Sequence, residues 1–153
     1  MKLHDINVLI YAFRKDSQYH ALSRALLNEA ITSPASFAIT GHTLCGFLRI
    51  ATDRRIFPKD PAPLPIALQF ARTLQTHPRA LFLGPGQRHW NLVEAICLRT
   101  GTIGPMVSDV YLAAIAIENG CELITFDRDY ARFPALTWRH PLESHAQTNP
   151  GKL

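Results

Sequence analysis

The sequence has few cysteines and lacks any long apolar run without charge. No stretch approaches the roughly 20 apolar residues that a membrane-spanning helix needs, and Asp5 and Asn7 interrupt the apolar N-terminal segment. The three cysteines, Cys45, Cys97 and Cys121, are far apart and show no zinc-ligand spacing. These absences exclude a membrane span, a disulfide scaffold and a zinc module. We therefore expect a cytoplasmic protein with buried, reduced thiols and no membrane partner.

Length and charge limit the remaining possibilities. A chain of 153 residues with 47% hydrophobic content predicts one domain with a well-formed core. We place this domain at residues 1–143 and expect a mobile polar tail at 144–153. The excess of 16 Lys and Arg over 12 Asp and Glu gives a formal charge of +4. This charge suits an anionic partner such as nucleic acid, but it is also common among ordinary soluble proteins.

Short apolar segments alternate with helical patterns along the chain. We expect strands over 2–5, 37–40, 80–83, 121–126 and 136–138, and helices over 17–31, 41–51, 66–76, 87–99 and 108–120. Ser17 and Ser108 are the expected helix starts, and the prolines between Phe57 and Pro65 predict an extended connector. Strands separated by single helices predict an α/β fold of three layers, α/β/α, with a mostly parallel central sheet.

Four aspartates interrupt or end apolar segments: Asp5, Asp109, Asp127 and Asp129. A carboxylate is rarely placed against a core without a partner, because desolvating an unpaired charge is costly. Asp5 and Asp127 follow predicted strands, and Asp109 opens a predicted helix. Ligands of parallel sheets gather at the carboxyl ends of the strands, so these acids are expected to converge there. The partner that we expect for them is a bound cation.

Each acid also has a structural alternative to weigh. Asp109 fits the first turn of a helix, where the dipole favours a carboxylate. Asp127 and Asp129 fit a turn in which aspartates accept backbone hydrogen bonds. Asp5 has neither an obvious cap nor an obvious turn, so it favours function most strongly.

Two polar residues and several arginines accompany the acids. We expect Asn7 to orient Asp5 and Thr125 to orient Asp127, as outer groups do in metal sites. The alternative is that both satisfy backbone groups. Guanidinium groups match phosphate oxygens, which favours an RNA-binding rim, although solvated surface arginine is the simpler interpretation. The arginines in question are Arg49, Arg54, Arg55 and Arg128.

The order of four short blocks is informative. They are Asp5-Ile6-Asn7-Val8-Leu9-Ile10-Tyr11-Ala12, Gly46-Phe47-Leu48-Arg49-Ile50, Asp109-Val110-Tyr111-Leu112-Ala113-Ala114 and Thr125-Phe126-Asp127-Arg128-Asp129-Tyr130. Together they resemble PIN-domain proteins, and more narrowly the VapC toxins of bacterial toxin-antitoxin pairs. The resemblance extends over residues 2 to about 140.

The resemblance implies a Mg²⁺- or Mn²⁺-dependent endoribonuclease that cleaves a structured cellular RNA. It also implies restraint by a VapB-type antitoxin and a homodimer. Asp5, Asp109 and Asp127 then hold the metal and carry catalysis, with Asp129 as an auxiliary ligand. The family commonly has a glutamate on the helix after the second strand, and Gly46 stands at that position here. Three aspartates still suit Mg²⁺, which prefers carboxylate and water oxygens.

Two other functions stay open. A PIN-like protein that binds RNA or a partner without cutting it would account for the missing glutamate. A Mg²⁺-dependent phosphatase on another doubly wound fold also uses aspartates at strand ends. It requires a phosphoryl-accepting Asp-x-Asp, whereas this chain has Asp5-Ile6-Asn7.

Overall fold

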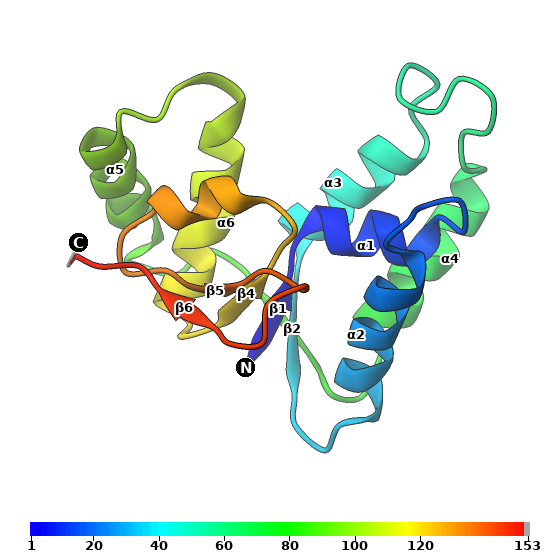
Figure 1. Ribbon diagram of the computed structural model, residues 1–153, viewed down its shortest axis with the longest axis horizontal. Coiled ribbons are helices and arrows are strands. Elements are labelled where there is room, and N and C mark those ends of the chain that lie inside the picture. Colours follow the sequence, from blue (N-terminus) through cyan, green and yellow to red (C-terminus); the bar gives the residue numbers. More distant parts are fainter. Residues whose placement is uncertain (152–153) are drawn as a thin grey trace.

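The computed structural model describes residues 1–151 (Figure 1). In chain order its elements are β1 Lys2–His4, α1 Ile6–Phe13, α2 His20–Thr32, β2 Phe37–Thr40, α3 Gly41–Ala51, α4 Leu64–Gln75, β3 Ala80–Leu83, α5 His89–Thr100, the 3₁₀ turn η1 Gly104–Met106, α6 Val107–Glu118, β4 Glu122–Ile124, the 3₁₀ turn η2 Arg128–Arg132, β5 Thr137–Arg139 and β6 Gln147–Thr148. Within these residues, every helix is too short or too polar to cross a membrane.

The strands form one sheet of six strands in the order β3-β2-β1-β4-β5-β6. All neighbouring pairs are parallel except β5 and β6, which are antiparallel. Figure 1 shows α5 and α6 on one side of the strands and α1 to α4 on the other. The expected three-layer α/β/α fold with a mostly parallel sheet is confirmed.

Two buried clusters stabilise the layers, one on each face of the sheet. Leu3 and Trp138 belong to the cluster formed with α5 and α6. Ile39 and Phe47 belong to the cluster formed with α1 to α4. Successive strand residues point to opposite faces, so the central strands supply side chains to both clusters. The packing therefore fixes the ends of β1 and β4, which Asp5 and Asp127 follow, and the start of α6, which carries Asp109.

Helix α1 was not expected from the sequence. Its residues Ile6–Phe13 are apolar almost throughout, so the segment shows no polar face to distinguish it from the strand that it follows. The structure ends the strand at His4 and starts the helix two residues later. Four of its residues are buried, including Leu9, which is fully buried, and this explains the missing polar face.

Two expected helix starts were wrong. Helix α2 begins at His20, and Ser17 lies in the preceding turn, where its hydroxyl accepts a hydrogen bond from the Tyr19 N–H. Helix α6 begins at Val107, so Ser108 is inside its first turn and does not cap it. Serine satisfies turn and helix-start geometries equally well, and sequence alone does not separate them.

The connector after α3 is shorter than expected, because α4 already begins at Leu64 and contains Pro65 in its first turn. Proline is tolerated there because the first N–H groups of a helix have no partner within the helix.

The expectation of buried thiols was wrong in part. Cys121 is buried, but Cys45 is exposed and Cys97 is half-buried, and all three are free.

Part of the expected tail is packed. Residues of β6 pair with β5, and Asn149 is buried beneath them. The Asn149 amide donates to the carbonyls of Tyr130 and Phe133 at 2.8 and 2.7 Å and accepts from the Trp138 indole at 2.9 Å. The end of the tail, residues 152–153, lies outside the described residues. The tail thus includes a strand, while its mobility stays a prediction.

Candidate functional site

Asp5 is held between β1 and α1. Its backbone N–H donates to Ile124 O of the neighbouring strand β4 at 3.0 Å, which ties it to the carboxyl edge of the sheet. Its side chain caps α1, because Oδ1 accepts the Ile6 N–H at 2.6 Å. Asp5 therefore has a helix cap that was not obvious from the sequence. A capping role leaves the other carboxylate oxygen, Oδ2, to interact across the site.

Asn7 and Thr125 both bond to that second oxygen. Asn7 Nδ2 donates to Asp5 Oδ2 at 2.8 Å, and the Thr125 hydroxyl donates to the same atom at 2.7 Å. Asn7 also donates to Thr125 Oγ1 at 3.0 Å and accepts from the Phe126 N–H at 3.2 Å. The network joins residues 118 and more positions apart, and it fixes the direction of the Asp5 carboxylate.

Thr125 acts differently from the expectation. Its hydroxyl donates to the Asp5 carboxylate and accepts a bond from the backbone N–H of Asp127 at 3.0 Å, not from that residue's side chain. The Asp127 carboxylate instead caps η2 by accepting the Asp129 N–H at 2.8 Å. The turn that we weighed for these two aspartates is thus present. Asp127 retains a second oxygen, and Asp129 is exposed.

Asp109 lies in the first turn of α6, which is the structural role weighed for it from the sequence. Asp5, Asp109 and Asp127 come from three separate parts of the chain, yet their charges act on one another. Burial raises the pKa of Asp5 to about 6. The hydrogen bonds from Thr125 and Ile6 lower this pKa, and the charges of Asp109 and Asp127 raise it. Burial also raises the pKa of Asp109 to about 6, and the Asp127 charge adds to it. The three carboxyls form one electrostatic cluster.

Tyr130 is a member of this cluster that sequence reasoning missed. Its hydroxyl is buried and completes no hydrogen bond within residues 1–151, although it approaches Asp109 and opposes the rise of that pKa. Burial raises the pKa of Tyr130 well above its usual range, and the charges of Asp5, Asp109 and Asp127 raise it further. The only available signal was its place directly after Asp129, which is too weak to predict a role.

The donor chemistry suits a hard divalent cation. The carboxyls repel one another at neutral pH, and a cation among them would remove that repulsion. Among residues 1–151, no three His, Cys, Asp or Glu side chains come close enough to hold an ion by direct contacts alone. Mg²⁺ keeps several waters and often binds through one or two carboxylates, so this spacing still fits it.

The four arginines do not share one environment. Arg55 forms an ion pair with Asp53 at 2.9 Å, and Arg128 pairs with Glu143 at 2.7 Å. Arg49 lies on α3 and Arg54 on the loop that follows it, and both are exposed. Within residues 1–151, none of these four arginines bonds to an acid of the cluster, and an RNA-binding rim stays a prediction.

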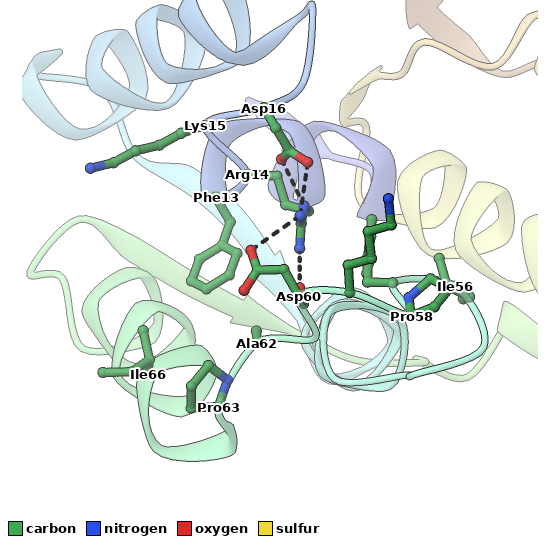
Figure 2. A pocket seen from close by; sticks show the side chains of 12 residues that line it. Phe13, Arg14, Lys15, Asp16, Ile56, Pro58, Asp60, Ala62, Pro63 and Ile66 are labelled. Atoms are coloured by element: carbon green, nitrogen blue, oxygen red, sulfur yellow. Dashed lines mark hydrogen bonds and ion pairs between the residues drawn. The ribbon is translucent and has the colours of Figure 1, made fainter.

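An apolar groove lies apart from the acids. Figure 2 shows the residues that line it, between the end of α1 and the loop from α3 to α4. The volume of the groove is about 760 Å³. Arg14 crosses it, bonded to the Asp16 carboxylate at 2.8 Å and to the Asp60 carbonyl at 2.7 Å, with its guanidinium 4.0 Å from the centre of the Phe57 ring. Ile66 in its lining is 52% exposed, so the groove presents apolar surface to solvent.

Comparisons with known proteins agree with this architecture. The PIN domain family model matches residues 2–136. A VapC ribonuclease of Mycobacterium bovis, Mb2897, is 37% identical over 139 residues, covering 91% of this chain and 94% of that protein. Ribonuclease VapC25 of Mycobacterium tuberculosis is 33% identical over 141 residues, covering 92% of this chain and 99% of that protein.

Solved structures share the fold at lower identity. VapBC2 from Rickettsia felis, bound to a promoter DNA fragment, matches with a TM-score of 0.60 at 16% identity, covering 89% of this chain and 95% of that one. VapC20 of Mycobacterium tuberculosis, a toxin that cleaves the sarcin-ricin loop, matches with a TM-score of 0.59 at 14% identity, covering 84% and 91%. The family match over most of the chain, with relatives above 30% identity, shows that this protein belongs to the PIN-domain family and has VapC ribonucleases among its relatives.

Proposed function

We propose that this protein is a divalent-metal-dependent endoribonuclease, the toxin of a VapBC-type pair, acting on a structured cellular RNA. One observation carries the proposal: burial and the charge of Asp127 raise the pKa of both Asp5 and Asp109, and the three carboxyls come from distant parts of the chain. Without a cation, this cluster opposes folding at neutral pH. With Mg²⁺ or Mn²⁺ it becomes a site for phosphate.

Each residue has a defined task in this proposal. Asp5, Asp109 and Asp127 would hold the cation, with Asp129 at its margin, while Asn7 and Thr125 keep the Asp5 carboxylate in one direction. The bound cation would supply activation of water and neutralisation of charge on the phosphodiester. Tyr130, buried and protonated, places its hydroxyl near Asp109.

The test is cleavage of labelled cellular RNA in Mg²⁺, in Mn²⁺ and in EDTA. Wild type is expected to cut only with metal, and Asp5→Asn and Asp109→Asn to lose at least about 10²-fold in rate. Glu94→Gln is the matched control, because Glu94 is an exposed acid on α5 away from the cluster. Equal cleavage by wild type and both aspartate variants would exclude the proposal.

A non-catalytic PIN-like binder is the second candidate, and position 46 favours it. A side chain at Gly46 would collide with Ile6, so no acid can enter the site from there without rearrangement. Calorimetric titration separates the two functions. A binder should show salt-sensitive RNA affinity but little Mg²⁺ affinity, whereas the nuclease should bind Mg²⁺ and lose that binding in Asp5→Asn.

We also propose that an antitoxin segment lies in the groove of Figure 2. Its apolar lining and the cations Lys15 and Lys59 at its margin suit a segment with apolar and acidic side chains. Ile66→Glu should abolish co-purification with the co-expressed product of the neighbouring gene. Leu98→Glu should not, because Leu98 is 85% exposed on α5, on the other side of the sheet. Co-purification by both variants would place the antitoxin elsewhere.

A further inference from the structure

His42 and Gly46 lie on one side of α3, because side chains four positions apart on a helix are neighbours. The segment Gly41–Ala51 contains no acid, and the space beside Gly46 is filled by Ile6. His42 is therefore the residue on this side of α3 whose side chain can accept a proton. It stands one turn nearer to the carboxyl end of β2 than Gly46 does.

The His42 ring reaches the start of α6. Its Nε2 lies 3.3 Å from the Ser108 hydroxyl oxygen, and Ser108 directly precedes Asp109. When Ser108 accepts from Nε2, the proton of the neutral ring is on that nitrogen and Nδ1 carries the free lone pair. Within residues 1–151, Nδ1 forms no hydrogen bond, so it is available to a water molecule or a substrate group.

Stacking on α6 fixes the position of the ring. His42 stacks on Tyr111, with ring centres 5.1 Å apart and an angle of 27°. Tyr111 is supported in turn by His89 of α5, whose ring meets it edge-on at 4.3 Å and whose Nε2 lies 3.0 Å from the Tyr111 carbonyl oxygen. A half-buried imidazole that contacts two side chains of α6, one of them supported from α5, is placed more firmly than a solvated surface histidine.

The neighbours of His42 favour its neutral form. Burial lowers the pKa of His42, and the charge of His89 lowers it further. The other groups in contact with it are the Ser108 hydroxyl and the Tyr111 ring. A neutral imidazole is the form that takes up a proton during hydrolysis.

We propose that His42 is a further catalytic residue, which accepts the proton of the attacking water in place of the acid that α3 lacks. This inference rests on the proposed function. The water oxygen forms a bond to phosphorus, the bond from phosphorus to the leaving 3′ oxygen breaks, the water proton moves to His42, and the leaving oxygen takes a proton from solvent. His42 then returns its proton to solvent.

Chemical rescue tests this role. The probe is a labelled RNA hairpin containing a site that wild type cuts, in Mg²⁺ and under single-turnover conditions. His42→Ala should cleave at least about 10²-fold more slowly and recover with added imidazole, because the free base takes the vacated place. Acidification alone does not discriminate, since Asp5 and Asp109 also titrate near pH 6. His145→Ala is the matched control, as His145 is exposed near the end of the chain.

A second variant and a second measurement separate chemistry from folding. His42→Gln retains a group that can bond to Ser108 and should fold, bind RNA like wild type and cleave as slowly as His42→Ala. Affinity is measured in the Asp5→Asn background, where cleavage is expected to be at least about 10²-fold slower. Full activity of His42→Gln, or slow cleavage by His42→Ala that imidazole does not restore, would overturn the role of His42 alone. Absence of cleavage by wild type would overturn the proposed function, and this inference with it.

Discussion

The side chain of Ile6 occupies the space that a side chain at position 46 would need. A Cβ atom on Gly46 would stand 2.8 Å from Ile6 Cγ1 and closer still to Cδ1. Ile6 directly follows Asp5 at the start of α1, so the absence of an acid on α3 and the placing of Asp5 are parts of one packing arrangement. The glycine at the position where the resemblance implies a glutamate is thus accompanied by an apolar side chain that fills the space from helix α1.

Gly46→Ala should destabilise the wild type although alanine favours a helix by about 1 kcal/mol over glycine. The added methyl forces Ile6 out of place, at a cost of about 1–3 kcal/mol. In the Ile6→Ala background the same exchange should be stabilising, because the opposing atoms are gone. Urea unfolding of the four proteins in this double-mutant cycle measures the coupling. Additive effects of the two substitutions would show that Ile6 moves aside freely.

Asp109→Asn should stabilise the protein at pH 8 and have little effect at pH 4. The pKa of Asp109 is about 6 in the folded protein and 3.8 as its ordinary value, so the folded state holds the proton more tightly. Its contribution to stability therefore falls as pH rises from about 4 to about 6. The two-unit rise corresponds to about 3 kcal/mol for a fully buried group, which solvent screening of half-buried Asp109 reduces to about 1 kcal/mol. Thermal unfolding without metal at both pH values measures it; no gain at pH 8 would contradict the electrostatic cluster.

His4→Leu should reduce the loss of stability on acidification. His4 is 1% exposed, neither ring nitrogen has a partner within residues 1–151, and burial lowers its pKa from 6.5 to about 4. Between these values the unfolded chain binds a proton that the folded protein does not, so stability falls as pH drops from about 6.5 to about 4. The difference between wild type and variant should grow by about 3 kcal/mol across this window.

Wild type and His4→Leu have to be compared at each pH, because the raised pKa values of Asp5 and Asp109 increase stability on acidification over much of the same range, which is the opposite of the His4 effect. Denaturant unfolding at pH 7, 5.5 and 4 gives the three points. His145→Ala serves as the control, since its histidine is exposed. Parallel pH profiles for wild type and His4→Leu would mean that His4 gains a proton without leaving its site.

Asn149→Ala should lower the unfolding free energy by about 2–4 kcal/mol. The substitution leaves the carbonyls of Tyr130 and Phe133 and the indole N–H of Trp138 without their buried partner. Thr148→Ala is the control at the neighbouring position, because the bond of Thr148 to Thr137 is exposed. Equal stability of the two variants would show that the end of the chain adds little to the fold.

Much of the fold was predictable because its signals are local. The strands at Phe37–Thr40 and Ala80–Leu83 were placed to the residue, since β-favouring runs there are bounded by turn residues. The predicted end of helix α5 at Gly101 is also confirmed. The backbone of Gly101 is left-handed, with φ of 65°, and glycine adopts this conformation without strain. Helix α1 was missed because a helix buried on most sides loses the polar stripe that identifies it.

The sequence by itself determined the layer order, the family and the identity of the acids, because hydrophobic period and motif order are properties of the chain. Only the tertiary structure decided what surrounds those acids. Hydrogen bonds that span more than a hundred residues direct Thr125 to Asp5, and packing between two helices lets Ile6 close position 46. The contacts of His42 and Tyr130 arise in the same way, from elements that meet only when the sheet has formed. The spacing of residues along the chain does not predict these contacts. Parallel strands pair segments that are far apart in sequence, and the length of the crossover between them sets that separation.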